Sequence, residues 1–212
     1  MEKLVIFDLD GTIVAEPEFY RKVYSGTLRE LIYQESGAEG IKMLEYCRQH
    51  HQGKGELALS RLNIPFSKWA GRLINAPLDG VRPQTALVKR IRRLAAKKVI
   101  YTGSPIQLTI RLLRQSGFWE ADFDQIIAWK ESEPKPLKWS RSSLVFKSIV
   151  SRFNLKPADC WAVGNDWETD LAPAKKIGIK TALICDDGGK PDAHFRTLDE
   201  FLNFLAVRSE KT

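Results

Sequence analysis

The stretch Leu4-Val5-Ile6-Phe7-Asp8-Leu9-Asp10-Gly11-Thr12 places four apolar residues directly before two acids, a glycine and a threonine. The apolar run is typical of a buried strand, and Gly11 marks its end. Because side chains alternate along a strand, Asp8 and Asp10 start on the same side. Two adjacent carboxylates stay ionised together only when a cation lies between them, and oxygen-rich acidic sites suit Mg²⁺. The spacing alone fits a metal-assisted carboxylate site and an Asp-rich turn equally well.

Length and composition indicate a soluble globular protein. The 212 residues suffice for one domain, or for a domain with a smaller one attached. No apolar run is long enough to span a membrane, and the N-terminus lacks the basic region of a signal peptide. Three widely spaced cysteines, Cys47, Cys160 and Cys185, form no CxxC pair, so we expect buried thiols in a reducing, cytoplasmic setting.

The net charge of +7 is concentrated in one short segment. Its basic residues are Lys89, Arg90, Arg92, Arg93, Lys97 and Lys98. One interpretation is a nucleic-acid-binding face. We favour the solvated side of an amphipathic helix, because Leu87, Val88 and Ile91 fill the opposite side at helical spacing and no nucleic-acid motif accompanies the charge. A positive field would still attract anionic substrates.

The pattern along the chain changes twice. Residues 17–78 show helical periodicity and no convincing strand, which predicts a small all-helical insert. From Pro83 onward, helices and strands alternate, which predicts βαβ units in a mainly parallel, doubly wound sheet with a Rossmann-like core. The strands expected after the first lie within 99–102, 123–129, 160–163 and 181–185.

Polar residues follow three of these expected strands. They are Asp8 and Asp10 after the first, Thr102 to Ser104 after the second, and Asn165 with Asp166 after a later one. Ligands of such sheets bind beyond the carboxyl ends of the strands. Acids or hydroxyls at three strand ends therefore favour a functional site over a simple turn.

The segment Asp8-Leu9-Asp10-Gly11-Thr12 resembles the first motif of the haloacid dehalogenase-like hydrolase superfamily, Asp-x-Asp-Gly-Thr at the end of the first strand. In the phosphatases of that family the first acid is the nucleophile. Asp8 would form an aspartyl-phosphate, and Asp10 would act as general acid and then as general base. The acid at position 10 argues against the dehalogenase branch, which lacks one there.

The resemblance also implies a set of groups that bind phosphate. Thr102 matches the second motif, with the Gly103 amide beside it, although Thr102 could instead be a helix N-cap. Lys135, followed by Pro136, fits the third motif best. The rival lysines are Lys130, Lys138 and Lys147.

The fourth motif of the family usually reads Gly-Asp, followed after a few residues by a second Asp. Here the chain reads Gly164-Asn165-Asp166-Trp167-Glu168-Thr169-Asp170. Asn165 takes the place of the usual metal-binding acid, and Asp166 lies one residue later. We expect Mg²⁺ to be held by Asp8, Asp10 and Asp166, with Asn165 as a close rival. Asp170 would support the site, or act as an acid at a helix N-terminus.

The resemblance implies a catalytic core formed by residues 1–14 and 80–212, and a helical cap formed by residues 15–79. It implies a Mg²⁺-dependent phosphatase of a small phosphorylated metabolite, vaguely similar to the pyrimidine 5′-nucleotidase and phosphoglycolate phosphatase branches. One alternative is a sugar-phosphate mutase of the same superfamily. Another is a catalytically impaired binding or regulatory protein that uses its basic helix as a partner face. The sequence leaves the substrate and the oligomeric state open.

Overall fold

The chain divides into two compact units. The computed structural model describes residues 3–51, 54–184 and 188–209. The first unit comprises the chain up to Ala15, Arg82–Trp129 and the chain from Pro136 on. The second comprises Glu16–Val81 and Lys130–Lys135. The insert was expected from the sequence at residues 15–79, and in the structure it comprises Glu16–Val81. The segment Lys130–Lys135, which was expected in the core, clusters with the insert.

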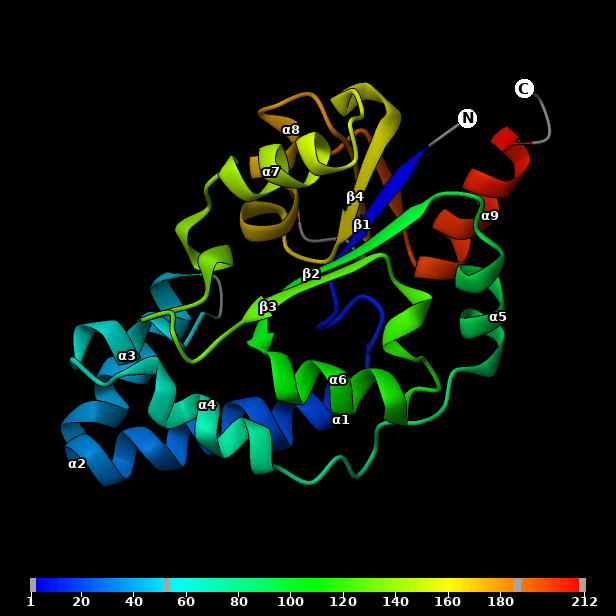
Figure 1. Cartoon of the computed structure of the whole chain (residues 1–212). Coiled ribbons are helices and arrows are strands. Elements are labelled where there is room, and N and C mark those ends of the chain that lie inside the picture. Colours follow the sequence, from blue (N-terminus) through cyan, green and yellow to red (C-terminus); the bar gives the residue numbers. More distant parts are fainter. Residues whose placement is uncertain (1–2, 52–53, 185–187, 210–212) are drawn as a thin grey trace. The chain divides into compact units, whose positions relative to one another are not determined.

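The first unit is built around a six-stranded sheet with the order β3-β2-β1-β4-β5-β6 (Figure 1). Every neighbouring pair is parallel. Its strands are β1 (Leu4–Phe7), β2 (Lys97–Pro105), β3 (Gln125–Trp129), β4 (Cys160–Gly164), β5 (Lys180–Ile184) and β6 (Ala193–Phe195). The predicted α/β fold with a mainly parallel sheet is confirmed.

Helices cover both faces of this sheet (Figure 1). The helices of the first unit are α5 (Thr85–Arg93), α6 (Ile106–Gln115), α7 (Leu144–Arg152), α8 (Ala172–Lys175) and α9 (Leu198–Ser209). On one face, Leu4 and Ile6 of β1 share a buried cluster with Phe146 of α7. On the other, the rings of Trp161 in β4 and Phe201 in α9 lie 5.6 Å apart. The apolar stretch of β1 is therefore buried from both sides, as expected for a central parallel strand.

Short helical turns join several of these elements. They are the 3₁₀ turns η2 (Glu120–Asp122), η3 (Leu137–Ser140) and η4 (Pro157–Asp159), and the π-helical turn η5 (Trp167–Leu171). Isolated π turns are frequent at functional sites. The turn η5 directly follows β4, where the sequence placed the fourth motif.

The strand ends differ in detail from the sequence prediction. The strand β2 continues to Pro105, beyond the end expected at Thr102, with a shift of register against β3 between Tyr101 and Pro105. The short strand β6 was not predicted, because three residues carry too weak a pattern. Of the strand predicted over 181–185, Cys185 lies outside the described residues.

In the second unit, all regular elements among the described residues are helices, joined by turns and irregular segments. Its elements are α1 (Pro17–Phe19), the π-helical turn η1 (Tyr20–Ser25), α2 (Gly26–His50), α3 (Leu57–Arg61) and α4 (Phe66–Asn75). Gly37 interrupts α2 with φ 59° and ψ −149°, so α2 consists of two segments that meet at a kink. Trp69 of α4 donates through Nε1 to Thr27 Oγ1 of α2 at 3.0 Å, and its ring lies edge-on to Tyr24. These contacts join the amphipathic helices around their own core.

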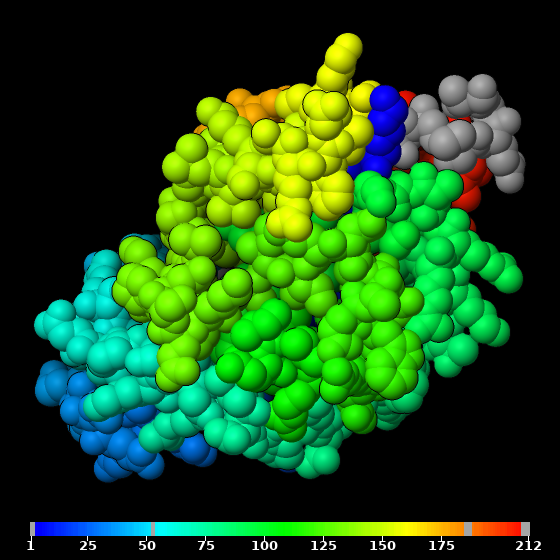
Figure 2. Space-filling model, in the orientation of Figure 1, coloured from blue at the N-terminus to red at the C-terminus, as the bar shows by residue number. Residues whose placement is uncertain are grey.

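Several basic side chains of the Lys89–Lys98 segment are engaged within the first unit. Arg92 forms two hydrogen bonds with Asp122, at 2.7 and 2.8 Å, and Lys97 pairs with Asp124 at 2.9 Å. Arg90 binds Asp199 and Asn203 of α9. The segment lies at the surface, along the green right-hand edge in Figure 2. The solvated helix face expected from the sequence covers only the first part of the segment, because α5 ends at Arg93 and Lys97 and Lys98 begin β2.

Two smaller findings concern the membrane and the thiols. No helix within the described part of the chain is both long and apolar enough to cross a membrane. Cys47 and Cys160 are buried, and among the described residues neither forms a disulfide.

Candidate active site

The carboxyl end of β1 runs into a tight turn that carries both acids of the opening stretch. The Gly11 amide donates to the Val14 carbonyl at 2.7 Å, and the Val14 amide donates to the Leu9 carbonyl at 2.9 Å. Gly11 has φ +84°, and a Cβ at this position would collide with the side-chain amide of Asn165. Only glycine therefore lets Asn165 approach the turn so closely.

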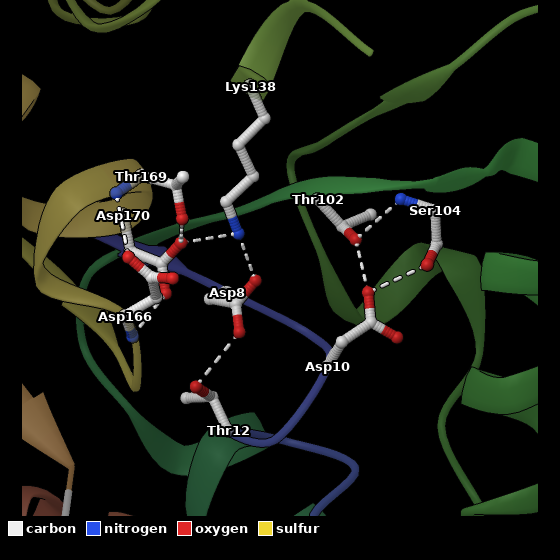
Figure 3. Close-up of polar contacts among 9 residues, drawn as sticks. All are labelled: Asp8, Asp10, Thr12, Thr102, Ser104, Lys138, Asp166, Thr169 and Asp170. Carbon is white, nitrogen blue, oxygen red and sulfur yellow. Dashed lines mark hydrogen bonds and ion pairs between the residues drawn. The ribbon is translucent and has the colours of Figure 1, made fainter. Parts of the chain in front are cut away.

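Asp8 is buried, with 4% of its surface exposed, and both of its carboxylate oxygens accept hydrogen bonds (Figure 3). Thr12 Oγ1 donates to Oδ2 at 3.0 Å, and Lys138 Nζ donates to Oδ1. The Asp8 backbone amide donates to the carbonyl of Val163 in β4 at 2.9 Å. These bonds fix the carboxylate at the edge of the sheet where β1 and β4 end.

Lys138 connects two buried carboxylates. It comes from η3, is 8% exposed, and pairs with Asp8 and, at 2.7 Å, with Asp170 Oδ1. Asp170 also accepts from Thr169 Oγ1 at 2.9 Å and from the Asp166 amide at 3.0 Å. Asp170 is thus held from three directions, and it in turn holds the ammonium beside Asp8.

The environment shifts the pKa of both partners. Burial raises the pKa of Asp8 to about 8, the Lys138 ammonium opposes this rise, and the charges of Asp170 and Asp10 add to it. Burial alone would lower the pKa of Lys138, but attraction by Asp170 and Asp8 outweighs burial and raises it. Lys138 therefore remains an ammonium at neutral pH and supplies a fixed positive charge next to Asp8.

Asp10 is held by two hydroxyl groups from the end of β2 (Figure 3). Thr102 Oγ1 and Ser104 Oγ each donate to Asp10 Oδ2 at 2.7 Å. The Ser104 amide donates to Thr102 Oγ1 at 3.0 Å. Thr102 and Ser104 are both buried, whereas Asp10 is half-buried.

Asn165 follows β4 and brings its amide to the two acids. One polar atom of this amide lies 3.0 Å from the Asp10 carbonyl oxygen and 3.3 Å from Asp8 Oδ2. With its nitrogen turned toward them, the amide donates to both oxygens. With its oxygen turned toward them, the amide oxygen, the Asp10 carbonyl oxygen and Asp8 Oδ2 lie close together. In an octahedral Mg²⁺ site, neighbouring ligand oxygens lie about 3.0 Å apart. The two distances from the Asn165 amide, to the Asp10 carbonyl and to Asp8 Oδ2, therefore fit this cation.

Asp166 has a different position. Its Oδ1 accepts from the Thr169 amide at 3.0 Å, so Asp166 is the N-cap of the turn η5. Among residues 3–51, 54–184 and 188–209, no three His, Cys, Asp or Glu side chains gather as a metal site. A metal at this edge would therefore depend on backbone and amide oxygens as well as on Asp8. Asp166 thus has a partner within its own turn, whereas the Asn165 amide lies against Asp8 and the Asp10 carbonyl.

The structure brings together most of the site residues expected from the sequence, namely Asp8, Asp10, Thr102, Asn165 and Asp170. For the lysine, the structure places the rival Lys138 against Asp8, whereas Lys135 is exposed and clusters with the second unit. The reason is local, because the chain is extended at Pro136 and then turns through η3, which directs Lys138 inward. Gly103 lies in β2 between the two hydroxyl residues.

The sequence analysis assigned no role to three side chains at this site: Thr12, Ser104 and Thr169. Thr12 lies within the first motif, and Ser104 lies within the polar end of the second strand. Both positions were noted, but the partner of a hydroxyl group depends on backbone direction, which the residue pattern alone does not specify.

Comparison with known families gives one clear match. Residues 2–178 match the model of the haloacid dehalogenase-like hydrolases. Two similar relatives are the glyceraldehyde 3-phosphate phosphatases of Pyrococcus abyssi and Pyrococcus furiosus. The first is 23% identical over 203 residues, covering 85% of this chain and 80% of the relative. The second is 23% identical over 201 residues, covering 84% and 79%.

Solved structures show the same fold. A HAD-hydrolase from Bacillus subtilis bound to magnesium has a TM-score of 0.64 at 16% identity, with 97% of this chain and 99% of that chain covered. A HAD phosphatase from Thermococcus onnurineus has a TM-score of 0.57 at 22% identity, with 96% and 97% covered.

Proposed function

The chain belongs to the haloacid dehalogenase-like hydrolase family, and we propose that this phosphoric monoester hydrolase acts on a small phosphorylated metabolite through an aspartyl-phosphate on Asp8. The observation that carries the proposal is the arrangement of Asp8. It is buried at a strand end, lies beside the Lys138 ammonium, and has a second acid two residues further on. A carboxylate placed in this way can act as a nucleophile toward phosphorus.

The first step transfers the phosphoryl group to the enzyme. An oxygen of Asp8 forms a bond to phosphorus as the bond to the ester oxygen breaks, and Asp10 gives a proton to the departing alkoxide. In the second step water attacks the phosphorus and gives its proton to Asp10. Phosphate leaves, and the Asp8 carboxylate is restored. Asp10 thus gives a proton in the first step and takes one back in the second, and Asp8 attacks as the carboxylate, the form that the Lys138 ammonium favours.

The negative charge that develops on the phosphoryl oxygens needs donors on several sides. Lys138 supplies a positive charge, the Thr102 hydroxyl supplies a hydrogen bond, and the Gly103 amide lies next to it in β2. Asp8, the Asp10 carbonyl and Asn165 would hold Mg²⁺, which supplies further positive charge for the same oxygens when bound. The helical unit would act as a cap that excludes water and selects the substrate.

A phosphate-release assay on a panel of phosphate esters tests the proposal. We expect Mg²⁺-dependent turnover of at least one small ester, with the panel including glyceraldehyde 3-phosphate, phosphoglycolate and nucleoside monophosphates. Chelation of the metal should abolish turnover, and added Mg²⁺ should restore it. A bisphosphorylated sugar that is isomerised instead of hydrolysed would indicate a mutase. Absence of turnover across the panel would contradict the assignment and favour a binding protein.

Substitution at Asn165 and Asp166 separates the two candidate metal ligands. We expect Asn165→Ala to raise the Mg²⁺ concentration for half-maximal activity by roughly tenfold or more, since it removes a ligand oxygen. Asn165→Asp should keep or tighten Mg²⁺ binding because it adds a charge. Asp166→Ala should remove an N-cap, lowering stability by about 1 kcal/mol with little effect on Mg²⁺.

Mg²⁺ binding should raise the unfolding temperature, and the size of this rise measures the affinity for Mg²⁺ independently of enzyme activity. If Asp166→Ala weakens this rise more than Asn165→Ala does, then Asp166 is the ligand and the assignment to Asn165 is wrong.

A further inference from the structure

We propose that Ser104 is a positioning residue that holds Asp10 by one oxygen, so that the other oxygen is presented to the reacting atoms. The proposal rests on the proposed function, in which Asp10 is the acid and base. It starts from an unusual convergence: two buried hydroxyls, Thr102 and Ser104, donate to the same oxygen of one half-buried carboxylate, each at 2.7 Å.

The bond pattern suits a group that must alternate between two protonation states. Asp10 Oδ2 can accept both hydroxyl bonds when the carboxyl group is ionised and also when the proton lies on Oδ1. The contacts with Oδ2 therefore need not change during the cycle. Oδ2 thus keeps the carboxyl group oriented, and in this proposal Oδ1 carries the proton.

The two hydroxyls are not equivalent. A hydroxyl group has one proton to donate, so Thr102 cannot serve Asp10 and a substrate phosphate at the same time. The Ser104 amide donates to Thr102 Oγ1 at 3.0 Å, which keeps the threonine oxygen in place while its proton turns. When Thr102 turns toward phosphate, the Ser104 hydroxyl remains on Asp10 and keeps the carboxyl group oriented.

The test uses substrates that differ in their need for a general acid. An alkyl phosphate releases a strongly basic alkoxide and depends on proton donation, whereas p-nitrophenyl phosphate releases a weakly basic phenolate and depends on it far less. We expect Ser104→Ala to lower kcat/KM by roughly tenfold or more for the alkyl ester that the panel identifies. For p-nitrophenyl phosphate the loss should stay below about threefold, and Ser104→Thr should restore most of the difference.

Three further variants serve as controls for the Ser104→Ala measurement. Ser116 is a fully buried serine whose hydroxyl has no hydrogen-bond partner among the described residues. Ser116→Ala makes the same chemical change away from the site and should leave both substrates unaffected. Thr102→Ala should weaken turnover of both substrates alike, because both carry the phosphate. Asp10→Asn should reproduce the leaving-group dependence more strongly than Ser104→Ala.

The outcomes distinguish this proposal from the one on which it rests. Equal losses on both substrates in Ser104→Ala would mean a structural role only, and unchanged kinetics would mean no role. Either result overturns the inference while leaving the proposed function intact, provided that Asp10→Asn discriminates between the substrates. If Asp10→Asn shows no such discrimination, the role of Asp10 as general acid fails, and the positioning role of Ser104 fails with it.

Discussion

Replacement of Asp8 by asparagine is expected to lower phosphatase turnover by roughly 10⁴-fold or more while leaving the fold intact. The amide has almost the same shape, and its oxygen can still accept from Lys138 while its NH2 group donates to Thr12 Oγ1, but it cannot form the acyl-phosphate. Turnover of the best ester from the panel, compared between the wild type and Asp8→Asn, gives the measurement. Phosphorylation of the Asp8-containing peptide after an acid quench should disappear in parallel.

The same variant should not be less stable than the wild type at neutral pH in the absence of metal. Burial raises the pKa of Asp8 to about 8, so this group favours folding below its ordinary pKa, and this contribution is lost as the pH rises toward 8. Asparagine removes that pH dependence, and Lys138 keeps Asp170 as a partner. Denaturant unfolding between pH 4 and pH 8 should therefore show a flatter profile for Asp8→Asn, within that range.

An active Asp8→Asn enzyme would contradict the nucleophile assignment. Asp159, which pairs with Lys3 at the opposite end of the strands, offers a control. Asp159→Asn makes the same chemical change and should leave turnover unaffected. A large loss of stability in Asp8→Asn would instead show that the buried ion pair stabilises the fold more than the burial of Asp8 destabilises it.

The part of the fold that could be predicted from sequence is the part with a strong local pattern. The four apolar residues Leu4–Phe7 are central in a parallel sheet, and parallel strands buried on both faces read as continuous apolar runs. Because parallel strands end at the same edge, the acids, hydroxyls and amide that follow them meet there. The strand β6, with three residues after Pro191 and Asp192, has no such pattern and depends on pairing with β5.

The site residues that could not be predicted are those in irregular segments, where the backbone conformation determines which way the side chain points. Lys135 and Lys138 are three residues apart in a loop, where neither the helical nor the strand period applies. The 3₁₀ turn after Pro136 decides that Lys138 points inward. Asn165 and Asp166 are adjacent, and the N-cap bond to Thr169 turns Asp166 away from the oxygens that Asn165 approaches.

Ser104 illustrates the same limit in a strand. Gly103-Ser104-Pro105 follows the strand expected within 99–102, and its residue types are typical of a turn. In the structure these residues extend β2, and the pairing with β3 shifts in register across them. This extension carries the Ser104 hydroxyl to Asp10. Such an irregularity is a property of the packed sheet and leaves no periodic trace in the sequence.

Replacement of Lys138 by methionine is expected to remove activity and to destabilise the protein at neutral pH. Methionine keeps an unbranched side chain of similar length but leaves Asp8 and Asp170 buried without their shared ammonium. Removing one partner of a buried ion pair costs about 3–5 kcal/mol. Turnover should fall by roughly 10³-fold or more, because the developing phosphoryl charge loses its fixed cation. Chemical denaturation and the phosphate-release assay measure the two effects.

The matched control is Lys135→Met, which the sequence alone would have chosen as the damaging variant. Lys135 is exposed, so this change should shift stability by less than about 0.5 kcal/mol. If Lys135→Met abolishes turnover while Lys138→Met does not, the assignment of the lysine is reversed.

The stability loss in Lys138→Met should also depend on pH. Without the ammonium that lowers it, the pKa of Asp8 should rise further, so the buried Asp8 becomes easier to protonate than to keep ionised. The variant should therefore recover stability as the pH falls and lose it as the pH rises.

Adding Asp170→Asn to Lys138→Met removes one of the two uncompensated carboxylates and should restore part of the stability. It should restore none of the activity, because the cation required by the phosphoryl group is still missing. Recovery of stability without activity would separate the structural contribution of Lys138 from its catalytic one, whereas recovery of both would mean that the lysine serves the fold alone.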